Sequence, residues 1–154
     1  MKFTAYLLLF LVINFGGLYL GTLLMNNGPN AEWYLNLNKA PWTPPGWVFG
    51  AAWTCIMLCF SIYLSFLFQW KSSTGLWSLF GIQVFLNVIW NYVFFNQHMT
   101  ILGLVIIVSL LIVILYYFVN FKADKLKTTR LLLLPYLIWL CIAVSLNLYV
   151  VIHN

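Results

Sequence analysis

Acidic residues are almost missing from this chain of 154 residues, which contains two carboxylates, Glu32 and Asp124, and 6% charged residues in all. A soluble domain carries roughly a quarter charged residues, so a folded, water-facing surface cannot be built from this composition. Both carboxylates lie in polar segments between long apolar runs. The sequence therefore excludes a catalytic carboxylate pair and a buried acidic proton relay.

Cysteine and histidine are also scarce, with three cysteines and two histidines in the chain. Cys55 and Cys59 lie four residues apart and Cys141 lies in another apolar run, a spacing that fits no zinc, iron–sulfur or disulfide framework. A thiol on an apolar helix face is usually a small core residue, so we expect these three to be buried. His98 and His153 are expected to be solvated. We expect no metal and no required cofactor, and any bound ring must be held by aromatic packing and amides.

Long apolar runs dominate what is present. Hydrophobic residues make up 64% of the chain, the mean hydropathy is +0.98, and alternating β-barrel patterning is absent. Since a membrane-spanning helix needs about 20 apolar residues, the sequence predicts an all-α integral membrane bundle of five transmembrane helices, forming a single domain over residues 1–154. The first run follows Lys2 as a signal peptide does, but no cleavage site closes it, so we predict a retained helix. The predicted spans are about 5–25, 47–69, 76–95, 101–120 and 130–152.

Basic residues are distributed unequally between the two sides of this predicted bundle. Only Lys39 falls on the side opposite to the others, so the positive-inside rule predicts a multi-pass protein of the cell membrane with a cytoplasmic N-terminus and an external C-terminus. The formal net charge of +5 then reflects topology and contact with the lipid bilayer rather than nucleic-acid binding. The residues on the basic side are Lys2, Lys71, Lys122, Lys125, Lys127 and Arg130.

The loop between the first two spans is rich in proline and tryptophan. Pro41, Pro44 and Pro45 fix φ and remove N–H donors, so this stretch cannot continue as a helix. It can be interpreted as a lid over a flat apolar ligand. Alternatively, its indoles simply lie at the lipid headgroups, where membrane proteins commonly place them. The indoles concerned are Trp33, Trp42, Trp47 and Trp53.

Three tryptophans are predicted to lie deeper than an interfacial belt. From the helical rise, Trp53, Trp90 and Trp139 lie on the order of 9–20 Å below the outer surface. Trp70 and Trp77, which flank the short inner loop, are assigned to the aromatic belt instead. The deep indoles therefore lie beneath the proline-rich loop, in the outer half of the bundle.

Amide side chains converge at the same depth. Polar side chains in a span are costly unless they face the interior of the bundle or a cavity. For Asn14, Asn91 and Asn147 we favour hydrogen bonds between helices. Asn87 shares a helix face with Trp90. For its amide, a hydrogen bond to a ligand and a hydrogen bond to a neighbouring helix are equally good interpretations.

Two glycines in the first span, Gly17 and Gly21, are spaced as in the motif that permits close helix contact. This contact can form either within one chain or across a dimer. The sequence leaves both arrangements open.

Three motifs in a fixed order resemble the TspO/MBR family, the tryptophan-rich sensory proteins related to the mitochondrial translocator protein (peripheral benzodiazepine receptor). The resemblance covers essentially the whole chain. The matching residues are Trp33-Tyr34 with Lys39-Ala40-Pro41-Trp42-x-Pro44-Pro45-x-Trp47-Val48-Phe49-Gly50-x-x-Trp53, then Leu86-Asn87-x-x-Trp90-x-x-x-Phe94-Phe95, and Pro135-Tyr136-Leu137-x-Trp139-Leu140-x-x-Ala143-x-x-Leu146-Asn147.

The resemblance implies a five-helix bundle, often a homodimer, that binds porphyrins and also isoquinoline carboxamides or sterols. It further implies roles in tetrapyrrole traffic and in light-dependent breakdown of protoporphyrin IX. Tyr149 is not followed by the Lys or Arg that the proposed cholesterol pattern needs, which weighs against sterol binding here. Carried over by motif, the ligand pocket consists of Tyr34, Trp53, Asn87, Trp90, Trp139, Ala143 and Leu146.

Two hypotheses about function follow. In the first, the protein binds a tetrapyrrole and promotes its photo-oxidation, with Trp53 and Trp139 as catalytic residues, because an electron-rich indole can exchange an electron with a photoexcited porphyrin. In the second, the protein transports tetrapyrroles or senses their level without chemistry. No intramembrane carboxylate or arginine is expected, which weighs against an energy-coupled pump.

Overall fold

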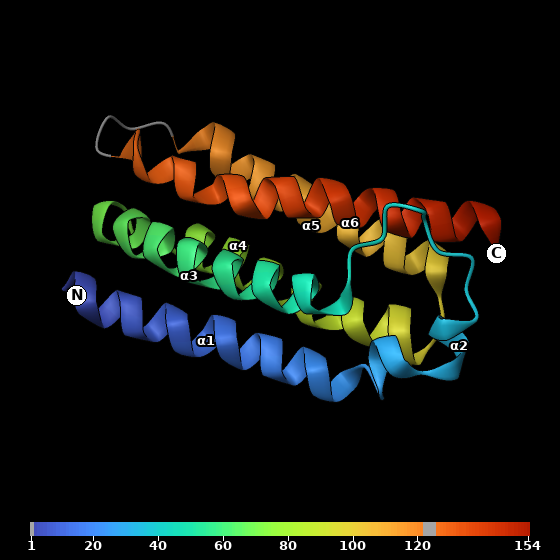
Figure 1. Cartoon of the computed structure of the whole chain (residues 1–154). Helices are drawn as coiled ribbons and strands as arrows, with labels where there is room; N and C mark the ends of the chain where they lie inside the picture. Colours follow the sequence, from blue (N-terminus) through green and yellow to red (C-terminus); the bar gives the residue numbers. More distant parts are fainter. Residues whose placement is uncertain (1, 122–125) are drawn as a thin grey trace.

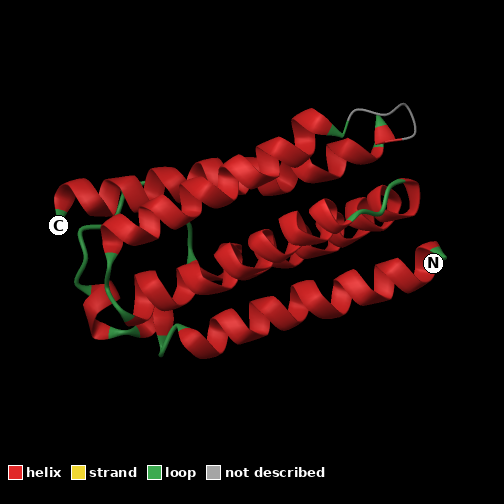
Figure 2. Ribbon diagram, turned by 180° about the vertical axis from the view of Figure 1, so that it is seen from behind, coloured by secondary structure: helices red, strands yellow, loops and turns green. Residues whose placement is uncertain are grey.

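The computed structural model describes residues 2–121 and 126–154, and in this part of the chain every regular element is a helix (Figure 1 and Figure 2). Five of these helices are long and apolar enough to cross a membrane. The predicted five-helix membrane bundle is therefore confirmed. The long helices are α1 (Phe3–Leu24), α3 (Gly46–Trp70), α4 (Thr74–Asn91), α5 (Thr100–Asn120) and α6 (Leu134–His153).

Short elements connect or extend the long helices. The end of the bundle that holds the C-terminus is called the outer end, after the predicted orientation. There, η1 (Gly28–Asn30) and α2 (Glu32–Leu35) follow α1. Helix α4 continues without a break into a π-helical turn, η2 (Tyr92–Asn96). A 3-10 turn, η4 (Thr129–Leu133), leads into α6, where Pro135 lies in the first turn and its missing N–H costs little.

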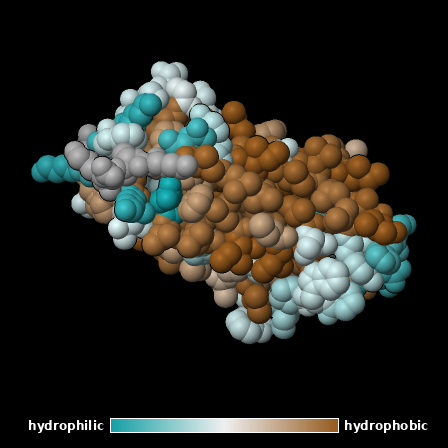
Figure 3. Space-filling model, turned by 90° about the horizontal axis from the view of Figure 1, so that it is seen from above, coloured by the Kyte–Doolittle hydropathy of each residue, from teal (hydrophilic) through white to brown (hydrophobic). Residues whose placement is uncertain are grey.

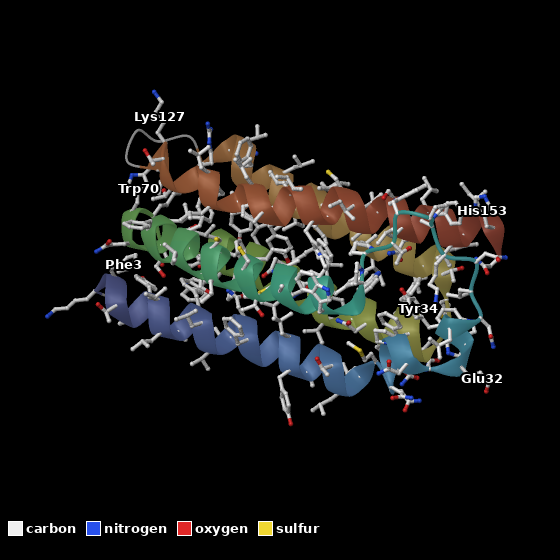
Figure 4. The ribbon with its side chains drawn as sticks, in the orientation of Figure 1. Phe3, Glu32, Tyr34, Trp70, Lys127 and His153 are labelled. Carbon is white, nitrogen blue, oxygen red and sulfur yellow. The ribbon has the colours of Figure 1, made fainter. Side chains whose placement is uncertain are left out.

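The surface of the bundle matches a membrane protein. Figure 3 shows a broad apolar band between two ends at which hydrophilic residues gather. In Figure 4, Phe3, Trp70 and Lys127 lie at one end, and Tyr34 and His153 lie at the other. Lys2 and Lys71 adjoin Phe3 and Trp70 in the sequence, so they lie at the same end as Lys127. Lys122 and Lys125 lie outside the described residues.

The two glycines of α1 face α4 within the same chain. A Cβ added at Gly21 would lie 2.6 Å from Nδ2 of Asn91, which is closer than real contacts allow. At Gly17 the nearest side-chain atom, on Val88, would be 3.6 Å away. Of the two arrangements that the sequence leaves open, the structure therefore shows the close helix contact within one chain.

The predicted burial of the cysteines is wrong. Cys55 and Cys141 are exposed, and Cys59 is only half-buried. They lie on outward faces of α3 and α6, where the surroundings are lipid in a membrane-spanning helix. A small apolar thiol has no reason to avoid such surroundings, so the rule taken from soluble cores does not apply.

Candidate ligand-binding cavity

A cavity of about 800 Å³ occupies the outer half of the bundle. The five long helices contribute to its walls, α5 through Ile107 alone, and η1, α2, the proline-rich loop and η2 form its outer end. Its size lies within the range of small-molecule sites. All seven residues carried over by motif line this one cavity, namely Tyr34, Trp53, Asn87, Trp90, Trp139, Ala143 and Leu146.

Trp53 of α3 and Trp139 of α6 each pack against an aromatic ring on the other's helix. The ring of Trp139 is 7% exposed and meets Phe49 of α3 edge to face, with ring centroids 5.2 Å apart. Trp53 is half-buried and meets Tyr136 of α6 in the same way at 5.9 Å. These two contacts hold both indoles in fixed orientations, because edge-to-face pairs are favoured arrangements of aromatic rings.

The third deep indole is fixed by stacking and by an amide. Trp90 lies parallel to Phe94 with centroids 5.3 Å apart, and its Nε1 donates a hydrogen bond of 3.4 Å to Oδ1 of Asn147. Asn147 in turn donates from Nδ2 to the carbonyl oxygen of Ala143 at 2.9 Å. The π-helical turn η2 places Phe94 and Phe95 on the cavity wall. Such turns often occur at functional sites.

The amides predicted to join helices do so in two of three cases. Asn14 donates to Ser61 of α3 at 2.8 Å, and Asn147 accepts from Trp90. Asn91 instead donates at 3.1 Å to the carbonyl of Asn87 in its own helix. The side-chain amide of Asn87 lines the cavity and makes no hydrogen bond within the described part of the chain, so it is open to a ligand.

The proline-rich loop covers the outer end of the cavity and is attached to α6. Asn38 donates from its backbone N–H to Oδ1 of Asn154 at 2.9 Å and from Nδ2 to the carbonyl of His153 at 3.1 Å. Trp42 donates from Nε1 to Ser145 at 3.1 Å. Ala40, between these attachments, is 4% exposed. The loop thus has the position of the predicted lid, whereas Trp47 is 74% exposed and suits the interface.

Tyr34 and Lys39 form the polar corner of the cavity. The ammonium of Lys39 lies 4.8 Å from the centroid of the Tyr34 ring and donates to the carbonyl oxygens of Tyr34 and Leu35 at 3.3 and 3.4 Å. The Tyr34 ring also packs against Phe95, with centroids 5.2 Å apart. Burial raises the pKa of the Tyr34 phenol, so this hydroxyl stays protonated and can donate a hydrogen bond.

The cavity opens sideways, between the end of α1 and the start of α3. Of the described residues that line it, those that are exposed all come from segments 22–30 and 46–54. Exposed apolar side chains such as Tyr19, Leu23 and Trp47 flank these segments. The opening is therefore bordered by apolar surface of the kind that faces lipid in a membrane-spanning bundle. Its edge consists of Thr22, Pro29, Asn30, Gly46, Gly50 and Thr54.

The remaining tryptophans lie away from the cavity. Trp70 and Trp77 are 43% and 36% exposed at the opposite end of the bundle, where Trp77 packs against Phe68. This position at one end of the bundle fits an aromatic belt, and its placement on the inner side of the membrane stays a prediction. His98 and His153 are exposed as expected.

Sequence reasoning missed Lys39 and the phenylalanines of η2 as cavity residues. Lys39 is interpreted from the sequence as a motif residue and as the single basic residue of the predicted outer side, but not as a cavity residue. Its isolation from the other basic residues is the signal that marks it. Phe94 and Phe95 belong to a quoted motif, but no periodicity in the sequence marks the π-helical turn that directs them inward.

The fold and the cavity together define a small polytopic membrane protein with a cavity lined by aromatic residues. The TspO/MBR family model matches residues 8–152, and the chain belongs to this family. The chain is similar to the tryptophan-rich protein TspO of Archaeoglobus fulgidus, with 32% identity over 100% of this chain and 97% of the relative. It is 35% identical to the tryptophan-rich sensory protein of Cereibacter sphaeroides (75% and 73% covered) and 29% identical to the human translocator protein (85% and 79% covered).

Proposed function

We propose that this protein binds tetrapyrroles such as protoporphyrin IX in the outer cavity and promotes their light-dependent oxidative degradation. The observation that carries the proposal is the convergence of Trp53, Trp90 and Trp139 on one cavity of about 800 Å³. A flat macrocycle stacks well on indole faces. The unpaired amide of Asn87 supplies a hydrogen bond to the edge of the ring.

The chemistry assigned to the chain is a single electron transfer. Light excites the bound macrocycle, which takes one electron from Trp53 or Trp139 and leaves an indole radical cation. Dissolved dioxygen, the oxidant, adds to the reduced macrocycle, and return of the electron to the indole radical cation restores the tryptophan. The net step adds one dioxygen across a carbon–carbon double bond of the ring, and this bond breaks to leave one oxygen atom on each carbon. The protein contributes the binding, the orientation of the ring against the indoles and the exclusion of water. No metal or further cofactor is required in this scheme.

Ultraviolet–visible spectra of the purified protein with protoporphyrin IX test this proposal directly. We expect a saturable shift of the porphyrin absorption bands in the dark and loss of these bands under light at a rate above that of porphyrin in empty micelles. If the bound porphyrin bleaches only at the rate seen in empty micelles, the protein binds the porphyrin but does not promote its degradation. A spectrum without saturation contradicts the proposal as a whole.

A carrier or sensor of tetrapyrroles is the second candidate function. The sideways opening favours it, because a ligand dissolved in the bilayer could enter and leave there without crossing the covered outer end. No carboxylate lies in the five spans of the described chain, which argues against coupling to protons. Drug-like isoquinoline carboxamides would occupy the same cavity as competitors.

The proposed setting is the cell membrane, with the N-terminus cytoplasmic, the C-terminus outside and two copies forming a homodimer. The asymmetry of basic residues supports the orientation. In a variant that lacks the native cysteines, His153→Cys should react with an impermeant thiol reagent in intact cells, and Asp124→Cys should be protected. The reverse pattern would invert the topology.

A further inference from the structure

One charged side chain lines the cavity, and it lies where the walls are otherwise apolar or uncharged. Among the described lining residues Lys39 alone carries a formal charge. It is half-buried between α2 and the proline-rich loop. A single cation on the lining of an otherwise uncharged cavity favours a ligand with a negative group at that position.

The contacts of Lys39 leave its charge without a counterion. Its ammonium donates to the carbonyl oxygens of Tyr34 and Leu35 at 3.3 and 3.4 Å and lies over the ring of Tyr34. All of these partners are neutral, and no carboxylate contacts the ammonium in the described part of the chain. Two long hydrogen bonds to neutral acceptors orient an ammonium but do not neutralise it, and its third N–H remains available.

A second positive element borders the same cavity. Helix α3 begins at Gly46, and Pro44 and Gly46 line the cavity together with Lys39. The first turn of a helix presents unpaired N–H groups and the positive end of the helix dipole. The Tyr34 hydroxyl also lines the cavity and adds a neutral donor. The cavity therefore combines groups that favour an anion, at Lys39, Tyr34 and the start of α3, with an apolar aromatic lining.

We infer that the cavity selects ligands that carry a carboxylate at one edge of a flat apolar body, and that Lys39 binds this carboxylate. The inference rests on the proposed function, since a tetrapyrrole with propionate side chains has this chemistry. The ring lies among Trp53, Trp90 and Trp139, and its acidic edge points to the outer loop. Lys39 acts as a specificity-determining residue and takes no part in electron transfer.

Comparison of protoporphyrin IX with its dimethyl ester tests this assignment, because the ester keeps the ring and removes the negative charges. Binding of both forms is titrated to wild type, Lys39→Met and Lys39→Arg in vesicles of uncharged lipid. We expect Lys39→Met to weaken binding of the acid about tenfold and to leave binding of the ester within about twofold. Lys39→Arg should retain the preference for the acid.

Two features of the design separate this role from loss of structure. Unequal partitioning of the two ligands into lipid cancels, because the same ligands are compared across variants. Retained ester binding shows that the cavity of Lys39→Met is intact. Lys71→Met, which removes an exposed lysine at the end of α3, is the matched control and should change neither affinity.

Equal losses for the acid and the ester in Lys39→Met would overturn the assignment, since the lysine would then only support the loop. Equal binding of both forms by all variants would also overturn it. If wild type binds neither form saturably, the proposed function itself fails, and this outcome is distinguishable from the other two.

Discussion

The inner and outer halves of the bundle are built from the same helices but are packed in opposite ways. In the inner half, Phe60, Tyr63 and Tyr117 are completely buried and meet one another at centroid distances of 5.8–6.5 Å. In the outer half, Phe49 and Trp53, one and two turns into α3, are only half-buried and border empty space. The difference indicates that the inner half supplies stability and the outer half supplies the site.

The sequence of α3 explains much of this contrast. Its outer part presents Gly46 and Gly50 toward the opening, and a Cβ added at either glycine would meet no atom within 4 Å. Its inner part carries Phe60, Leu64 and Leu67, all fully buried. Small residues at the outer end thus leave space that large residues fill at the inner end.

Truncation of an inner ring should have the largest effect on stability. Phe60→Ala is expected to lower the free energy of unfolding by about 3 kcal/mol, the lower end of the range for a buried phenylalanine, because the separated helices already lie in lipid. Phe49→Ala, at the cavity wall, should cost at most about 1 kcal/mol, since its ring already borders a void. Thermal unfolding in detergent compares the two, and similar losses would contradict the division into halves.

Replacement of a deep indole should have an intermediate effect, on affinity. Trp53→Phe and Trp139→Phe should each weaken porphyrin binding by about 0.5–1.5 kcal/mol, because a ring remains to stack. Trp70→Phe, in the inner belt, is the control and should bind as wild type does. Fluorescence titration measures the three affinities, and equal losses at all three positions would point to nonspecific partitioning.

Partial obstruction of the opening should have the smallest effect on affinity and act on rates instead. Gly50→Leu is expected to slow association and dissociation of protoporphyrin by similar factors and so leave the dissociation constant nearly unchanged. Gly81→Leu, on α4, is the matched control, because Gly81 is equally exposed and equally free of neighbours. Stopped-flow mixing with vesicles measures both rates. Wild-type rates in Gly50→Leu would show that the ligand enters elsewhere.

The five spans could be predicted from the sequence because each is an apolar run of the length that a bilayer requires. The deep indoles Trp53, Trp90 and Trp139 and the amide of Asn87 could be predicted as candidates from their depth and helix faces. Tyr34, Ala143 and Leu146 could be added only through the family motifs, since Ala143 and Leu146 have no chemistry of their own that marks a site. The structure places all seven around one cavity. Their roles in binding and catalysis stay predictions.

Other features depend on tertiary structure that periodicity does not encode. The outward direction of Cys55 and Cys141 depends on which face of each helix meets its neighbours. The π-helical turn after Asn91 and the sideways opening depend on how α4, α1 and α3 pack at their outer ends. The position of Lys39 over Tyr34 depends on how the proline-rich loop folds back.

The central claim is that the deep indoles of the outer cavity take part in chemistry as well as in binding. The most direct test is the rate at which saturating protoporphyrin IX is bleached under light by wild type, Trp53→Phe and Trp139→Phe. Phenylalanine stacks similarly but is far harder to oxidise. Saturation ensures that lower occupancy does not imitate slower chemistry. The account predicts much slower bleaching in either variant while the dark complex still forms, and bleaching at the wild-type rate in both would contradict it.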